Sequence, residues 1–284
     1  MPRVPEFHTI YGVDFSGAKQ AGKTTWVARI EPRSRGKFSL VALDRLDRLA
    51  GTAERTACLA KLVALVNASE AALWGFDFPF GLPVELFPPD TPWERQFDFL
   101  AEWDEDAYGC GVECIRRARL LGDKMHIRRL TDTDAKAPFD CYHYRIIYQT
   151  FYGMRDVVLP LSRTPGTAVL PFQYSKLPRA KRVAIECCPS SVLKKLALPH
   201  QNYKQPTGGP LTGKRRRTRH AILAGLSKMV RFGNRHRLVM MRNPGGDALD
   251  AVIAAVGAIR AFTTADHDAI RRHERYPREG YLFA

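Results

Sequence analysis

VDFSGAKQAGKTTW, residues 13–26, is compatible with two opposite structures. Its segment GAKQAGKT, residues 17–24, matches the phosphate-binding pattern G-x-x-x-x-G-K-[ST] at every fixed position. A phosphate-binding loop must continue directly into a helix, because the free N–H groups of the helix N-terminus hold the phosphates. The residues that follow, TTWVARIEP at 24–32, are rich in β-branched and aromatic side chains, which predicts a strand instead. We therefore interpret residues 16–23 as the loop of a β-hairpin.

The pattern around this hairpin is that of an α/β domain. TIYGVD, residues 9–14, predicts a first strand that ends in a carboxylate, and FSLVAL, residues 38–43, predicts a third strand antiparallel to the second. Residues 52–69 have a broad apolar face behind a threonine N-cap, which is typical of a helix. AALWGFD, residues 71–77, predicts a short buried strand. The expected order is three antiparallel strands, a helix and a returning strand.

The second half of the chain returns to regular patterns after an irregular segment. Residues 81–180 are rich in proline, aromatic and charged residues, and we interpret them as an insertion that covers a site within a single domain of residues 1–284. Helices are expected in it near 91–107 and 111–121. Beyond it, the pattern predicts a strand at 182–187, a helix opened by Pro189, a basic helix at 214–230 and a helix at 247–262.

Composition narrows the class of protein. The 284 residues carry a formal net charge of +15, which favours a polyanionic partner such as nucleic acid, either DNA or RNA, although some proteins are simply basic. There is no run of about 18 apolar residues and no apolar signal region, so we expect a cytoplasmic protein without a membrane partner. The six cysteines follow no disulfide framework. The spacing of Cys110, Cys114, Cys141 and His143 is too loose to favour a zinc site.

Several carboxylates stand where a predicted strand ends or a predicted helix begins. Asp14 ends the first strand, Asp77 ends the fourth, and Asp247 and Asp250 lie on one face of the last long helix. If the first and fourth strands are parallel neighbours, these side chains emerge at one edge of the sheet. Such oxygen ligands suit Mg²⁺ or Mn²⁺, which serve in phosphodiester cleavage. Taken singly, each aspartate also fits a helix cap or a turn, and Glu186 also fits an ion pair with an arginine.

In this order the motifs resemble the domain of unknown function 429 family. The resemblance rests on VDFSGA, GFDFPFGLP, IECCPSS, a Tyr-Lys pair before the basic helix and DALDAVIAA, and it covers most of the chain outside residues 81–180. Members of that family are described as predicted nucleases with a ribonuclease-H-like fold. The resemblance implies a carboxylate–metal site with Asp14, Asp77 and Asp250 as ligands, Asp247 as a fourth candidate, and a place for Glu186 in the site.

The helix predicted at 214–230 begins with a cluster of cations. Cations at a helix N-terminus oppose the helix dipole, which makes an anionic partner more attractive there. The candidate contacts to nucleic-acid phosphates are Lys19, Lys23, Lys214, Arg215, Arg216, Arg217 and Arg219. Tyrosines of the insertion are candidates for stacking on bases, although core positions are the favoured interpretation: Tyr142, Tyr144, Tyr148 and Tyr152.

Three functions are compatible with these features. The favoured one is a metal-dependent nuclease that uses Mg²⁺ or Mn²⁺. The second is a nucleic-acid-binding protein of the same fold without catalysis. The third and least favoured is a phosphate-loop nucleoside triphosphatase that uses Gly17–Thr24, and it requires a helix at residues 24–31.

Overall fold

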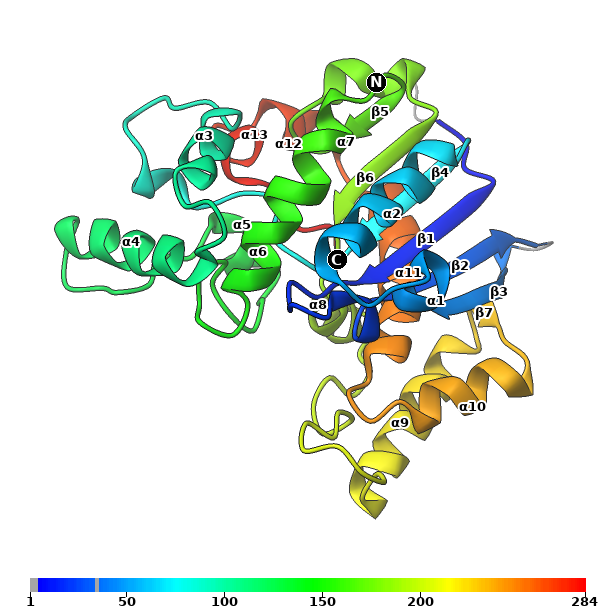
Figure 1. Ribbon diagram of the computed structural model, residues 1–284. Coiled ribbons are helices and arrows are strands. Elements are labelled where there is room, and N and C mark those ends of the chain that lie inside the picture. The colour runs from blue at the N-terminus through cyan, green and yellow to red at the C-terminus, as the bar shows by residue number, and fades with distance from the viewer. Residues whose placement is uncertain (1–4, 34–35) are drawn as a thin grey trace.

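A seven-stranded mixed sheet runs through the molecule in the computed structural model, which describes residues 5–33 and 36–284 (Figure 1). The strand order across the sheet is β5-β6-β4-β1-β2-β3-β7. The first three strands are antiparallel to one another, and β1, β4, β6 and β5 run parallel, as do β3 and β7. The strands are β1 (Thr9–Asp14), β2 (Trp26–Pro32), β3 (Phe38–Arg45), β4 (Ala72–Phe76), β5 (Thr167–Val169), β6 (Arg182–Glu186) and β7 (Val230–Arg231). The expected α/β class, with antiparallel strands followed by parallel strands, is confirmed.

Helices flank both faces of the sheet, with α2 on one face and the long α11 on the other (Figure 1). The longer helices are α2 (Arg55–Ala68), α4 (Ala107–Leu120), α9 (Gly213–Leu226), α10 (Asn234–Arg242) and α11 (Asp247–Thr264). The shorter ones are α1 (Leu46–Ala50), α3 (Arg95–Ala101), α5 (Leu130–Asp134), α6 (Ile147–Gly153), α7 (Leu159–Arg163), α8 (Pro189–Lys195), α12 (His267–Arg272) and α13 (Tyr276–Glu279). Among the described residues, no helix combines the length and the apolar character that crossing a bilayer requires.

The opening hairpin has the structure that its β-branched residues predict. After β1 the chain makes a short 3-10 turn at Ala21–Lys23 and enters β2 at Trp26, which pairs with Asp14 across the antiparallel ladder. The helix that a phosphate-binding loop requires after Gly17–Thr24 is therefore not formed. This finding overturns the interpretation of that segment as a phosphate-binding loop.

Elsewhere the structure departs from the predicted boundaries. The basic helix predicted at 214–230 ends at Leu226, because Val230 leaves the helix to pair with Phe38 at the edge of the sheet. The segment 81–180 contributes α4, several short helices and the edge strand β5, whose three residues are too few to give a recognisable alternating pattern. The helix expected near 91–107 is limited to α3.

Two glycines let α11 lie directly against the middle of the sheet. A Cβ atom on Gly12 of β1 would lie 2.1 Å from the carbonyl oxygen of Ala251 and 2.3 Å from the nitrogen of Ala255. A Cβ atom on Gly75 of β4 would lie 2.7 Å from the Cβ of Ala258. Alanines on the helix and glycines on the strands thus remove the side chains that would hold the two layers apart. The start of α11 is consequently fixed beside the ends of β1 and β4.

Replacing Gly12 by alanine is expected to lower the free energy of unfolding by about 1–3 kcal/mol, because the new methyl group meets the helix backbone and cannot rotate away. Gly213→Ala is a matched control, since the nearest heavy atom to its added Cβ is an Arg217 guanidinium nitrogen at 3.6 Å. Urea unfolding of both variants measures the difference. Equal losses in the two variants would contradict the close approach of α11 to β1.

Candidate carboxylate site

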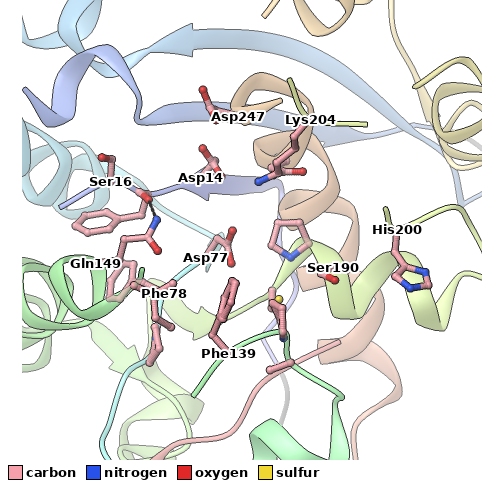
Figure 2. A pocket seen from close by; sticks show the side chains of 18 of the residues that line it. Asp14, Ser16, Asp77, Phe78, Phe139, Gln149, Ser190, His200, Lys204 and Asp247 are labelled. Carbon is pink, nitrogen blue, oxygen red and sulfur yellow. Dashed lines mark hydrogen bonds and ion pairs between the residues drawn. The ribbon is translucent and has the colours of Figure 1, made fainter. Parts of the chain in front are cut away.

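The candidate site is a cavity of about 640 Å³ into which the ends of β1 and β4 lead. Asp14, the last residue of β1, and Asp77, directly after β4, both line it. Asp247 and Asp250 reach the same cavity from the first turn of α11. Figure 2 shows Asp247, Asp14 and Asp77 following one another down one side of the cavity, with the Lys204 side chain beside them. The structure thus brings together the four aspartates that the sequence singled out, while their role as ligands stays a prediction.

Burial is the main reason why the pKa values of three carboxylates in this cluster are raised. Burial raises the pKa of Asp14 well above its usual value; Lys204 lowers it and the neighbouring aspartates raise it further. Burial, followed by the charge of Asp250, raises the pKa of Asp77 to about 8. Burial also raises the pKa of Asp247, which lies beside Asn243. A cluster with these properties is expected to attract a cation.

Lys204 is the cation that the protein itself places in this cluster. Its ammonium group forms an ion pair with Asp250, whose other carboxylate oxygen accepts a hydrogen bond of 2.9 Å from the Tyr203 hydroxyl. Asp250 is fully buried, whereas the Lys204 side chain is 47% exposed. Burial alone would lower the pKa of Lys204, but Asp250 and Asp14 raise it well above its usual value. Lys204 is therefore a charged lysine on a long, partly exposed side chain at the mouth of the site.

Arg219 holds the loop that carries Lys204 and does not contact solvent. Its guanidinium donates to the backbone carbonyl oxygens of Tyr203 (2.6 Å), Met240 (2.8 Å), Asn243 (2.6 Å) and Pro244 (2.8 Å). The prediction that Arg219 contacts a nucleic-acid phosphate is therefore wrong, because the side chain is fully buried and its donors are engaged.

A sequence signal for this burial was present. Arg219 begins the i, i+3, i+4, i+7 series that continues with three buried apolar residues of α9, namely Ile222, Leu223 and Leu226. Within the run of cations at the start of the helix, this spacing separates the inward-facing arginine from its outward-facing neighbours.

Glu186 lines the cavity but is not a free carboxylate. The fully buried Arg129 donates to both of its oxygens, at 2.8 and 2.6 Å, and the Phe80 backbone N–H donates to one of them at 3.0 Å. Arg129 also pairs with Asp132. This arrangement fits the simpler alternative of a structural ion pair with an arginine, while the catalytic role of Glu186 stays a prediction. Since Arg129 and Glu186 lie far apart in the chain, no local sequence pattern predicts that they pair.

The other predicted contacts lie outside the cluster. Arg215 lines the cavity, and its Nε donates to the carbonyl oxygen of Lys204 at 2.6 Å. Five predicted phosphate contacts are exposed and do not line the cavity, namely Lys19, Lys23, Lys214, Arg216 and Arg217. Of the four tyrosines considered for base stacking, Tyr142 and Tyr152 are buried, whereas Tyr144 and Tyr148 are exposed.

The donor set fits a divalent cation in charge and in chemistry, although it is not assembled as a finished coordination shell. In the part of the chain that the structure describes, no three side chains of His, Cys, Asp or Glu are arranged as a ready set of metal ligands. Asp14 and Asp77 are nevertheless hard oxygen donors with raised pKa values that face the cavity. The residues that would hold Mg²⁺ or Mn²⁺ are these two together with Asp247 and Asp250.

Some residues that line the cavity were not predicted as site residues. They come from the loop before α9 and from the segment 81–180. Tyr203 and Lys204 were recognised only as a motif before the basic helix. Phe139 and Gln149 come from the segment 81–180, and Figure 2 shows Gln149 below Ser16 and Phe139 below Asp77. The Gln149 amide nitrogen donates to the carbonyl oxygen of Phe15, directly after Asp14. No periodicity or spacing in that segment distinguishes these residues from their neighbours.

The raised pKa of Asp77 predicts a specific pH dependence of stability in metal-free buffer. The pKa rises from an ordinary value of 3.8 to about 8 on folding, so between these values the folded protein binds a proton that the unfolded chain has lost. Stability from this group is therefore fully present below pH 4 and is lost as the pH rises toward 8. Asp77→Asn, which stays neutral, should gain melting temperature relative to the wild type between pH 5 and pH 8.

The exposed Asp123 supplies the matched control for this titration, because Asp123→Asn removes the same charge from the surface. Thermal unfolding followed by circular dichroism at several pH values, with EDTA present, compares the three proteins. A difference between Asp77→Asn and the wild type that does not change with pH would contradict the half-buried, charge-crowded position of Asp77.

Comparisons of the chain with protein-family models, with curated proteins and with solved structures find no match. The resemblance to the domain of unknown function 429 family therefore stays a prediction, and the function has to be inferred from the residues of the cavity.

Proposed function

We propose that this protein is a metal-dependent nuclease with a ribonuclease-H-like fold, which hydrolyses phosphodiester bonds of a nucleic acid at the carboxylate cluster. The observation that carries the proposal is the convergence of Asp14, Asp77, Asp247 and Asp250 on one cavity, where Lys204 forms an ion pair with Asp250. The order of three antiparallel strands followed by parallel β4 and β6 is similar to the ribonuclease-H-like order and supports the fold assignment.

The role of each group in the proposed reaction follows from its position. A divalent cation, when bound, would activate water and offset the charge that develops on the phosphate oxygens. Asp14 and Asp77 provide negative charge from the rigid ends of β1 and β4, and Asp250 is kept in one orientation by the Tyr203 hydroxyl. The exposed part of the Lys204 side chain allows its ammonium group to turn from Asp250 toward a phosphate oxygen.

A nucleic-acid-binding protein without catalysis is the second candidate. It is favoured by one specific observation, the ion pair between Lys204 and the fully buried Asp250. That pair supplies a cation to the cluster from within the chain. In this alternative the aspartates and Lys204 are a structural network, and only the basic surface contacts nucleic acid.

Asp14→Asn and Asp250→Asn are expected to reduce cleavage of an oligonucleotide in Mg²⁺ or Mn²⁺ by at least about 100-fold, because each removes a carboxylate that would hold the divalent cation at the reacting phosphate. Both variants should also bind Mn²⁺ more weakly in isothermal titration calorimetry. Asp123→Asn is the control, since it lies on the surface away from the cavity.

Two outcomes would decide between the candidates. Cleavage that persists in a clean preparation of Asp14→Asn would show that the activity comes from elsewhere and would overturn the nuclease proposal. Salt-dependent binding of nucleic acid by the wild type, with neither Mn²⁺ binding nor cleavage, would establish the binding protein instead.

A further inference from the structure

One continuous segment of the chain is free of acidic residues. Residues 187–246 contain thirteen lysines and arginines and no aspartate or glutamate. The segment begins directly after Glu186 and ends directly before Asp247, so two acidic residues of the cavity wall bound it. It contains α8, the loop that carries Lys204, and then α9, β7 and α10. Most of the net charge of +15 is thus concentrated in about a fifth of the chain.

Most cations of this segment are exposed and lack carboxylate partners. Over the described residues, Lys204 is the only one of the thirteen that forms an ion pair, and Arg219 alone is buried. The exposed cations of α9 are Lys214, Arg216 and Arg217, and those that follow are Lys228, Arg231, Arg235, Arg237 and Arg242. Elsewhere in the molecule cations pair with carboxylates, as Arg116 does with Glu113. Unpaired cations at this density attract a polyanion from solution.

This charged surface is continuous with the cavity. Arg215 lines the cavity from the first turn of α9, while Lys214, Arg216 and Arg217 beside it face solvent. Figure 1 shows α9 and α10 extending away from the sheet at the end where α11 begins. The 14 residues of α9 span about 21 Å, which corresponds to about six base-pair steps of nucleic acid.

We propose that α9, β7 and α10 form a binding surface for the sugar-phosphate backbone, so that the ligand of the cavity is a polynucleotide rather than a small phosphoester. The statement about the cavity rests on the proposed function, whereas the binding surface does not. A lipid surface is a weaker fit to these residues. A helix that binds membranes presents several large apolar side chains beside its cations, but the exposed face of α9 continues with Ala221 and Ala224, and Leu238 of α10 is the one large apolar side chain exposed on these three elements, all of which the structure describes.

The test compares two triple charge reversals that change the net charge equally. The first combines Lys214→Glu, Arg216→Glu and Arg217→Glu on α9. The control combines Lys61→Glu, Arg119→Glu and Arg272→Glu, which are exposed on α2, α4 and α12. Fluorescence anisotropy with labelled single-stranded and duplex 20-mers of DNA and RNA measures affinity between 50 and 300 mM NaCl. Circular dichroism verifies that both variants remain folded.

The α9 variant is expected to lose about 100-fold or more in affinity, and its plot of log affinity against log salt should become shallower by about three. The control variant should change by less than tenfold. A 4-mer should bind far more weakly than a 20-mer. Equal losses in both variants, an unchanged α9 variant, or equal affinity for the 4-mer and the 20-mer would each overturn the inference, as would α9-dependent binding only to vesicles of phosphatidylserine.

The same assay separates this inference from the proposed function when it is repeated with Asp14→Asn in metal-free buffer. Binding of the 20-mer that depends on α9, combined with the absence of cleavage by the wild type, would overturn the nuclease proposal and leave the binding surface established. Cleavage of oligonucleotides by the wild type, combined with binding that does not depend on α9, would support the nuclease proposal and overturn the proposed binding surface.

Discussion

The close contact between α11 and the centre of the sheet is the constraint on which the site depends. Gly12 and Gly75 remove side chains from β1 and β4, and the facing alanines of α11 remove them from the helix. The two layers therefore approach to backbone contact, and the first turn of α11 reaches the ends of both strands. Asp14, Asp77, Asp247 and Asp250 come from three separate elements, yet this one contact places all of them in a single cavity. A wider spacing between the layers would carry the helix aspartates away from the strand aspartates.

Around the cavity, the acidic and basic side chains lie in separate regions. Acidic side chains with raised pKa values crowd the cavity, while the surface beside it is a segment without a single acidic residue. Lys204 and Arg215 stand at the boundary between these regions, since both line the cavity and both belong to the basic segment. The basic surface attracts a polyanion over a long range. A cation is needed only in the acidic cavity, because the carboxylates there would otherwise repel a phosphate group.

The elements with strong local signals were predictable from the sequence. The β-branched run after Thr24 indicated β2, and the convergence of Asp14 and Asp77 followed from placing their strands in parallel. The groups that complete the site were not predictable, because their partners are distant in the chain. Arg129 meets Glu186 through a segment without clear periodicity, and Lys204 lies on a loop whose path depends on Arg219. Local pattern thus located the carboxylates, whereas tertiary contacts determined which of them remain free.

Arg219 sets a limit on how this protein can be divided. Its guanidinium donates hydrogen bonds to carbonyl oxygens of the loop before α9 and of the turn between α10 and α11. One side chain thus connects the basic surface to the wall of the cavity. Deleting α9 and α10, or grafting them onto another scaffold, would leave those buried carbonyls without donors and would free the loop that holds Lys204. Although α9 and α10 project from the rest of the molecule, they are therefore not an exchangeable module. The binding surface and the cavity have to be engineered as one unit.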